Sequence, residues 1–145
     1  MKKIITTDFD MTLAYADAQN NGWLCVGTGV LKPIHKIIDL IKEKHKHGFE
    51  IHIVTFRHDK DMAEVKDFVK QYDLPIKEIH NTSSKSKTPV LKELNSTLHI
   101  DDALSVCLGA EAENIPCLFV NFGQTLDESQ KEIISRLDQI FIQLK

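Results

Sequence analysis

Residues 2–12 read Lys-Lys-Ile-Ile-Thr-Thr-Asp-Phe-Asp-Met-Thr, and this stretch decides the fold. Its β-branched run, Ile4–Thr7, is typical of a buried strand, and two aspartates, Asp8 and Asp10, follow it directly. Carboxylates this close repel each other in a half-buried place unless a cation or a shared proton lies between them. Mg²⁺ suits such an open strand end, because one or two carboxylates usually hold it together with water and substrate phosphate. An acidic turn is the alternative, since Asp favours turns.

The length and composition of the chain indicate a single domain. Its 145 residues are enough to bury roughly 70% of the surface that the unfolded chain exposes. The three cysteines, Cys25, Cys107 and Cys117, are odd in number and form no C-x-x-C pair, so we expect reduced thiols and a cytoplasmic protein. The net charge of −3 gives no overall attraction for long nucleic acid or an anionic membrane. The first apolar run is too short for a signal peptide, and no run reaches the length of a membrane span.

Strand-like and helix-like segments alternate along the chain. After the first strand, we expect four more strands at 51–54, 76–80, 97–100 and 117–120, and helices at 33–47, about 59–72, 88–94, about 103–113 and about 126–144. This alternation predicts an α/β fold, a doubly wound, Rossmann-like three-layer sandwich around a five-stranded parallel sheet. Residues 1–145 then form one domain. Residues 13–32 lack a sustained period and predict a flap, with a small hairpin near 23–26.

Polar side chains follow several of the expected strands, and in doubly wound sheets ligands bind beyond the carboxyl ends of the strands. These strand-end residues are Asp8, Asp10, Thr55, Asp101 and Asp102. Lys87, at the start of the short helix, can reach the same edge. Carboxylates suit Mg²⁺, and a hydroxyl with an ammonium suits the oxygens of a phosphoryl group.

These motifs, taken in order, resemble a phosphatase of the haloacid dehalogenase superfamily. The resemblance rests on Asp8-Phe9-Asp10-Met11-Thr12 as a D-x-D-x-T motif, on Thr55 after an apolar strand, on Lys87, and on Ile100-Asp101-Asp102. It implies that Asp8 is a nucleophile that forms an aspartyl phosphate, and that Asp10 is the general acid and base. It implies a phosphorylated small molecule as substrate, with a nucleotide or sugar phosphate as the expected class and nucleic-acid ends also compatible.

The resemblance also assigns the remaining site residues. Thr55 and Lys87 would bind the phosphoryl group, and Arg57 resembles an arginine that some relatives use for substrate contact, although a surface arginine is the alternative. For the metal, Asp102 with Asp8 and the Asp10 carbonyl would hold Mg²⁺, and Asp101 would be a supporting or second ligand. Met11 stands where many relatives have glycine.

The lysine assignment leaves alternatives, because Lys85 and Lys92 lie in the same region. Lys87 is preferred for its place at a helix start, and a solvated loop lysine is the ordinary state of this residue. Neither insertion point of this superfamily holds a cap domain, so the chain resembles the capless type. Its open site accepts bulky substrates or is closed by another subunit, and Tyr15 and Trp23 on the flap stack on substrate or pack within the flap.

Two other functions compete with a phosphatase. A receiver domain has a phosphorylated aspartate in a similar fold, but that aspartate would end the third strand, which here ends in Ile79-His80-Asn81. A catalytically silent binding protein is the second rival. Zinc is disfavoured, because the histidines lack tetrahedral-site spacing with cysteines. His52 and His99 lie within strands and are expected to be packed or hydrogen-bonded.

Overall fold

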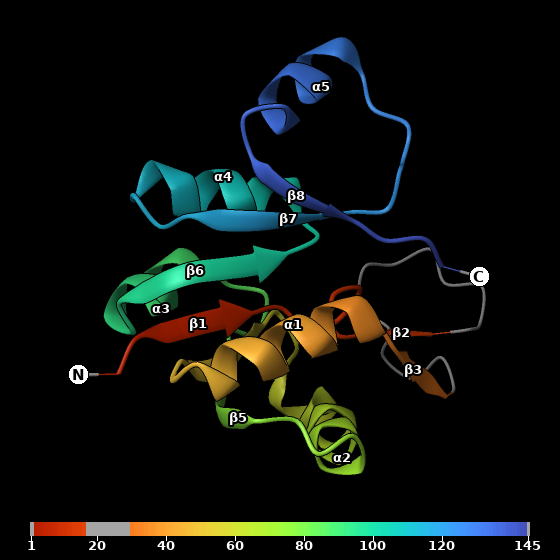
Figure 1. The fold of residues 1–145 in the computed structure, drawn as a ribbon, viewed down its shortest axis with the longest axis vertical. Helices are drawn as coiled ribbons and strands as arrows, with labels where there is room; N and C mark the ends of the chain where they lie inside the picture. Colours follow the sequence, from red (N-terminus) through yellow and green to blue (C-terminus); the bar gives the residue numbers. More distant parts are fainter. Residues whose placement is uncertain (1, 17–29, 145) are drawn as a thin grey trace.

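A computed structural model describes residues 2–16 and 30–144. Its centre is a six-stranded sheet with the order β5-β4-β1-β6-β7-β8, in which every neighbouring pair is parallel (Figure 1). The strands are β1 (Ile4–Thr7), β4 (Glu50–Thr55), β5 (Ile76–Asn81), β6 (Ser96–Asp101), β7 (Cys117–Asn121) and β8 (Asp138–Phe141). The parallel α/β fold is therefore confirmed, with one strand more than the sequence predicted.

Helices and short turns connect consecutive strands. They are α1 (His35–Lys46), the 3-10 turn η1 (Asp59–Asp61), α2 (Met62–Gln71), α3 (Thr88–Glu93), α4 (Leu104–Ala112) and α5 (Glu128–Ile134). The chain winds from β1 outward to β4 and β5, then returns to the other side of β1 for β6, β7 and β8. Strand order thus reverses between β1 and β6, which is where ligands bind in such folds.

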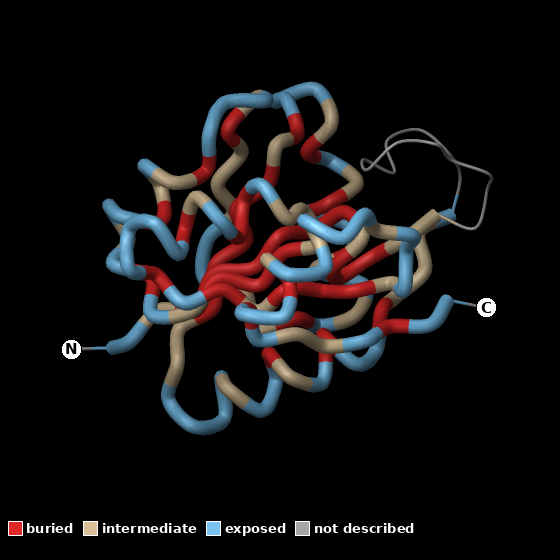
Figure 2. Tube along the Cα trace, turned by 90° about the horizontal axis from the view of Figure 1, so that it is seen from above, coloured by how far each residue is buried: buried red, intermediate tan, exposed pale blue. Residues whose placement is uncertain are grey.

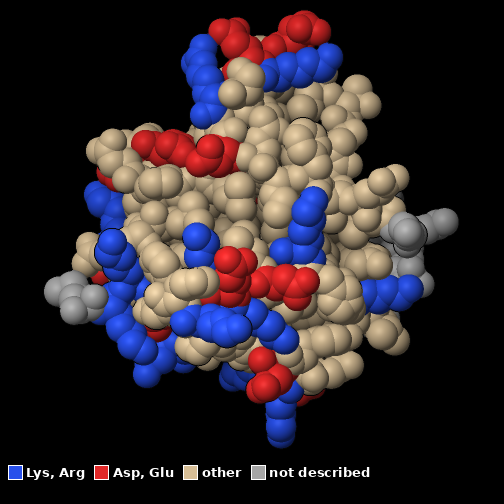
Figure 3. All heavy atoms as spheres, viewed as in Figure 1, with Lys and Arg blue, Asp and Glu red and all other residues tan. Residues whose placement is uncertain are grey.

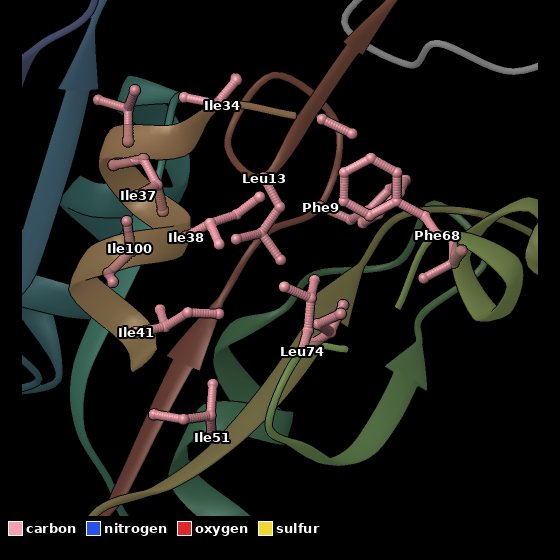
Figure 4. Close-up of a cluster of buried hydrophobic side chains, with 14 of the residues drawn as sticks. Phe9, Leu13, Ile34, Ile37, Ile38, Ile41, Ile51, Phe68, Leu74 and Ile100 are labelled. Carbon is pink, nitrogen blue, oxygen red and sulfur yellow. The ribbon is translucent and has the colours of Figure 1, made fainter. Parts of the chain in front are cut away.

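Two apolar clusters, one on each face of the sheet, form the three layers. The first cluster includes Ile37 and Ile41 of α1 together with Val65 and Phe68 of α2, and Figure 4 shows the α1 isoleucines between that helix and the strands. The second cluster is built by α3, α4 and the segment that follows α5. Figure 2 shows buried residues concentrated in the central strands. Burial of each such isoleucine contributes about 1.5–3 kcal/mol to the stability of the fold. The packing on both faces therefore fixes the positions of the strands and of the residues at their carboxyl ends.

The last predicted helix is wrong in its second half. Helix α5 ends at Ile134, and β8 follows within the stretch expected to be helical. The apolar residues of 133–144 do repeat at helical spacing, but β7 would otherwise present an unpaired edge, and β8 pairs with it from Leu118 to Asn121. Backbone pairing and sheet burial therefore override a local periodicity. Phe141, within the stretch expected to be helical, lies in β8 and is 63% exposed.

The described part of the flap is a two-stranded antiparallel sheet. It pairs β2 (Ala14–Ala16) with β3 (Leu31–Pro33), so Pro33 ends a strand and does not open the helix as predicted. The hairpin expected near 23–26, with Trp23 and Cys25, lies outside the described residues. Cys107 and Cys117 are free thiols, as expected, and both are buried.

Charged side chains of both signs are mixed on the surface, as the low net charge suggests. Figure 3 shows acidic and basic side chains interspersed on one face of the molecule, including both signs around α5, where Lys131 pairs with Glu128 and Arg136 with Glu132. Within residues 2–16 and 30–144, no helix combines the length and apolar character needed to cross a bilayer.

Candidate active site

Three strands bring the predicted site residues to one edge of the sheet. Asp8 follows β1, Thr55 ends β4 and Asp101 ends β6, so they meet at the point where strand order reverses. The backbone N–H of Asp8 donates to the carbonyl of Ile100 at 2.8 Å, which extends the pairing of β1 with β6 to the aspartate itself. The sequence therefore places a carboxylate at the end of the central strand β1, between the ends of β4 and β6.

Lys87 is the lysine that enters this site. Its Nζ donates to Asp8 Oδ1 and to Asp101 Oδ2, both at 2.9 Å, and the side chain is almost fully buried. Burial alone would lower the pKa of Lys87, but the two carboxylates raise it above its ordinary value, so the ammonium is charged. Lys85 and Lys92 are exposed, and Lys92 pairs with Glu113 at the surface.

The carboxylates of Asp8, Asp101 and Asp102 crowd one another. Each offers an oxygen, and these oxygens all lie within 4.8 Å of one another. Burial, followed by the charge of Asp101, raises the pKa of Asp8 to about 6, against the opposing effect of Lys87. Burial and the charge of Asp8 raise the pKa of Asp102 to about 11. One ammonium is too little positive charge for three carboxylates, so this group fits a divalent cation.

Asp101 and Asp102 differ in what already holds them. Asp101 Oδ2 accepts from Lys87 and faces His99 Nε2 at 2.8 Å, and its Oδ1 accepts from the backbone N–H of Ala103 at 3.0 Å. Burial opposes ionisation of Asp101, but Lys87 and His99 hold its pKa below the ordinary value. Asp102 has its strongest interactions with Asp8. Asp101 is therefore already held by Lys87, His99 and the Ala103 backbone, whereas Asp102 interacts with the neighbouring carboxylates.

His99 completes the support of Asp101. It is fully buried, and its Nδ1 lies 2.8 Å from Thr6 Oγ1 while Nε2 faces Asp101. This confirms the expectation that His99 is hydrogen-bonded within its strand. Its link to the site could be suspected from the spacing of two residues between His99 and Asp101, which places both side chains on the same face of β6.

Arg57 and Asp10 form a second ion pair beside the first. Arg57 Nε donates to Asp10 Oδ2 at 2.9 Å and Nη2 donates to Asp10 Oδ1 at 2.7 Å, with both side chains buried. Arg57 Nη1 donates to Glu64 and to the carbonyl of Asp61. The alternative of a surface arginine is wrong. The expected substrate contact of Arg57 stays a prediction, whereas its bidentate hold on Asp10 is observed.

The turn of the D-x-D-x-T motif is shaped by Met11 and Thr12. Thr12 Oγ1 donates to Asp8 Oδ2 at 3.3 Å. Met11 has a φ of 60°, in the left-handed region where glycine is favoured, which explains why a glycine suits this place in the motif. Thr55 is buried, and its Oγ1 accepts from the backbone N–H of Arg57 at 3.3 Å.

A separate cavity lies at the base of the flap. Its volume is about 780 Å³, and its described lining includes Tyr15, Phe122 and Phe141. None of the described lining residues belongs to the carboxylate cluster. The cavity therefore gives Tyr15 an aromatic environment of its own, and the contact of Tyr15 with a substrate remains a prediction.

Comparisons with known proteins locate the fold. No protein-family model matches the chain, and no curated protein matches it. The chain is similar to a structure from Bacteroides fragilis described as a haloacid dehalogenase-like hydrolase, with a TM-score of 0.65 and 13% identity, over 99% of this chain and 98% of that one. It is also similar to a chain in the structure of the Pnkp1/Rnl/Hen1 RNA repair complex, with a TM-score of 0.67 and 16% identity, over 86% of this chain and 43% of that one. At these identities the likeness establishes a shared α/β fold.

Proposed function

We propose that this chain is a capless phosphohydrolase of the haloacid dehalogenase superfamily that cleaves phosphate monoesters with Mg²⁺. The observation that carries the proposal is the position of Lys87 Nζ, 2.9 Å from both Asp8 and Asp101. A buried ammonium among carboxylates, at the switch point of a parallel sheet, suits a phosphoryl group and its cation. The shared fold with a haloacid dehalogenase-like hydrolase supports the same reading.

The carboxylate cluster is the proposed metal site. Asp8 and Asp102 would be direct ligands, because burial and, after it, the charge of a neighbouring carboxylate raise the pKa of both groups, and a divalent cation would stabilise their charged forms. Asp101 would support them through Lys87 and His99, and the carbonyl of Asp10 is the further expected ligand. When bound there, Mg²⁺ offsets negative charge on the phosphoryl oxygens.

The residues of this chain can then divide the reaction into two displacements. A carboxylate oxygen of Asp8 attacks phosphorus, and the bond from phosphorus to the leaving oxygen breaks as Asp10 gives that oxygen a proton. Water next attacks the aspartyl phosphate and gives a proton to Asp10, which releases phosphate and restores Asp8. Lys87 and Thr55 would bind the phosphoryl oxygens throughout.

The ion pair with Arg57 restricts what Asp10 can do in this reaction. Both oxygens of Asp10 accept from Arg57 in the structure, so the Asp10 carboxyl has to turn out of this pair to reach a leaving group. Glu64 and the Asp61 carbonyl hold Arg57 in place from the other side. We therefore assign Arg57 a positioning role for Asp10.

The substrate class follows from the open site and the composition. A nucleotide or a sugar phosphate is the first expectation. Phosphorylated RNA ends are a third class, because one similar structure belongs to an RNA repair complex. The interspersed surface charges offer no long basic stripe on the face in Figure 3, so long nucleic acid stays outside the proposal. A cytoplasmic location is part of the proposal as well.

The test is release of phosphate from nucleoside monophosphates, sugar phosphates and end-phosphorylated oligoribonucleotides, with Mg²⁺ or with EDTA. Wild type should release phosphate only with Mg²⁺, and Asp8→Asn should be inactive, while Lys92→Gln, which changes an exposed lysine, should match wild type. One equivalent of stable phosphate on Asp8 without turnover would instead indicate a receiver-like switch. Absence of both phosphorylation and turnover across all three substrate classes would indicate a binding protein.

A further inference from the structure

A second group of metal-ligating side chains lies at the outer edge of the sheet, on β4 and the edge strand β5 (Figure 1). The strand register pairs His52 with Glu78 and Val54 with His80. Because side chains alternate between faces along a strand, His52, Glu78 and His80 all project from one face. Ile51 and Ile53 project from the other face, into the core under α1.

The three side chains converge closely enough to share one ion. His52 Nδ1 lies 2.9 Å from His80 Nε2, and the two rings are stacked with centroids 5.2 Å apart and planes 11° apart. Glu78 Oε2 lies 3.9 Å from His80 Nε2. One nitrogen from each ring and the Glu78 oxygen all lie within 4.8 Å of one another.

Glu50 sets the proton on His52. Its Oε1 lies 2.8 Å from His52 Nε2, so this nitrogen carries the hydrogen and donates it to the carboxylate. The lone pair of His52 therefore sits on Nδ1, which faces His80. A carboxylate behind the far nitrogen of an imidazole is the usual arrangement around histidines that bind metals. Burial and the neighbouring His52 lower the pKa of His80 below its ordinary value.

We propose that His52, Glu78 and His80 form a binding site for a borderline transition metal such as Zn²⁺, separate from the carboxylate cluster. Two imidazoles and a carboxylate favour Zn²⁺, Co²⁺ or Ni²⁺, whereas Mg²⁺ prefers oxygen ligands alone. The histidines lack tetrahedral-site spacing with cysteines in the sequence, but a site assembled from two neighbouring strands needs no such spacing.

Binding requires one proton to move. Without metal, His80 Nε2 donates its hydrogen to His52 Nδ1. With metal, His80 takes the other tautomer, with the hydrogen on Nδ1. The lone pairs of His52 Nδ1 and His80 Nε2 then both bind the ion, and the His80 ring stays neutral. Two nitrogens on a tetrahedral Zn²⁺ lie about 3.3 Å apart, so His52 Nδ1 and His80 Nε2 must move apart from 2.9 Å and the rings must turn until both lone pairs point at the ion. His80 and Glu78 are partly exposed, at 24% and 61%, which allows that shift and leaves a fourth position for water.

The test is titration of the purified full chain with Co²⁺ in excess Mg²⁺, followed by visible absorption and then by displacement with Zn²⁺. Wild type should bind one Co²⁺ with the intense bands of a tetrahedral site. His80→Gln should lose the bands, Glu50→Gln should weaken binding by about 10–100-fold, and His47→Gln, an exposed histidine at the end of α1, should match wild type. Asp102→Asn should keep the bands, because the carboxylate cluster is not the site measured.

Glu78→Gln guards against a folding defect, because Glu78 is exposed on an edge strand and its loss leaves the histidine pair in place. It should bind Co²⁺ at least about tenfold more weakly than wild type while unfolding at the same temperature without metal. Absence of tetrahedral bands in wild type would overturn the proposal. Bands of equal intensity in wild type, His80→Gln and Glu78→Gln would overturn it too, since Co²⁺ would then be bound elsewhere.

Discussion

Replacing Asp102 by Asn should make the metal-free protein more stable at pH 7. The pKa of Asp102 is raised from 3.8 to about 11 in the folded chain, so folding requires this carboxyl to hold a proton that the unfolded chain has lost. At pH 7, about three units above 3.8, this costs the fold at most about 4 kcal/mol at roughly 1.4 kcal/mol per unit. Partial exposure reduces the effect, so we expect a gain of about 2–3 kcal/mol in Asp102→Asn.

The sign depends on pH and on metal. A raised pKa gives stability that is fully present below pH 3.8 and is lost as pH rises through about 11, so the gain in the variant should shrink to about 1 kcal/mol or less at pH 5. Mg²⁺ should reverse the order, because it stabilises the wild-type site and finds one ligand fewer in the variant. Urea unfolding at pH 5 and pH 7, with EDTA or Mg²⁺, measures both effects.

Asp101 provides the matched comparison. It neighbours Asp102 in sequence, but Lys87 and His99 hold its pKa below the ordinary value, so its carboxylate stabilises the fold above pH 3.8 and loses this effect as pH falls. Asp101→Asn should therefore destabilise the protein at pH 7, by about 3–5 kcal/mol for a broken buried pair. A lower stability of Asp102→Asn than of wild type in EDTA at pH 7, or a change of both variants in the same direction, would show that burial and charge do not set the stability of these two carboxyls in this way.

Two further predictions concern the neighbouring residues. Arg57→Lys keeps the charge but loses the bidentate grip on Asp10, so kcat should fall about 10–100-fold with KM nearly unchanged in steady-state assays on the best substrate. A rise in KM with kcat retained would show that Arg57 contacts substrate instead. Met11→Gly removes the strain of a side chain on a left-handed backbone, although glycine also gives the unfolded chain more entropy. The free energy of unfolding, measured in urea, should therefore rise by up to about 1 kcal/mol. A clear loss of stability would show that this turn is not strained at Met11.

The sequence predicted those parts of the site that depend on short-range signals. Asp8, Thr55 and Asp101 each end a short β-branched or apolar run, and the carboxyl ends of parallel strands necessarily meet at one edge. Lys87, preferred among three lysines for its place at a helix start, lies within hydrogen-bond distance of Asp8 and Asp101, and its binding of a phosphoryl group stays a prediction.

The features that the sequence did not predict depend on contacts between distant segments. Arg57 and Asp10 are 47 residues apart, and nothing near either residue indicates that they pair. The contact of His52 with His80 follows from the register of β4 against β5, which a single sequence does not specify. The segment of β8 is predicted as helix because its apolar residues repeat at helical spacing. It forms a strand because it pairs with β7, and this interaction cannot be seen within the segment itself.

The central position of β1 has a consequence for how the chain folds as it is synthesised. Asp8 directly follows β1, but its partner Lys87 comes 79 residues later, roughly 4–16 s at ordinary rates of translation. During that interval the nascent β1 lacks its neighbouring strand β6, and Asp8 lacks the positive charge of Lys87. The aspartates at its end therefore stay in water, and the strand can take its final place only when the second half of the chain has emerged from the ribosome.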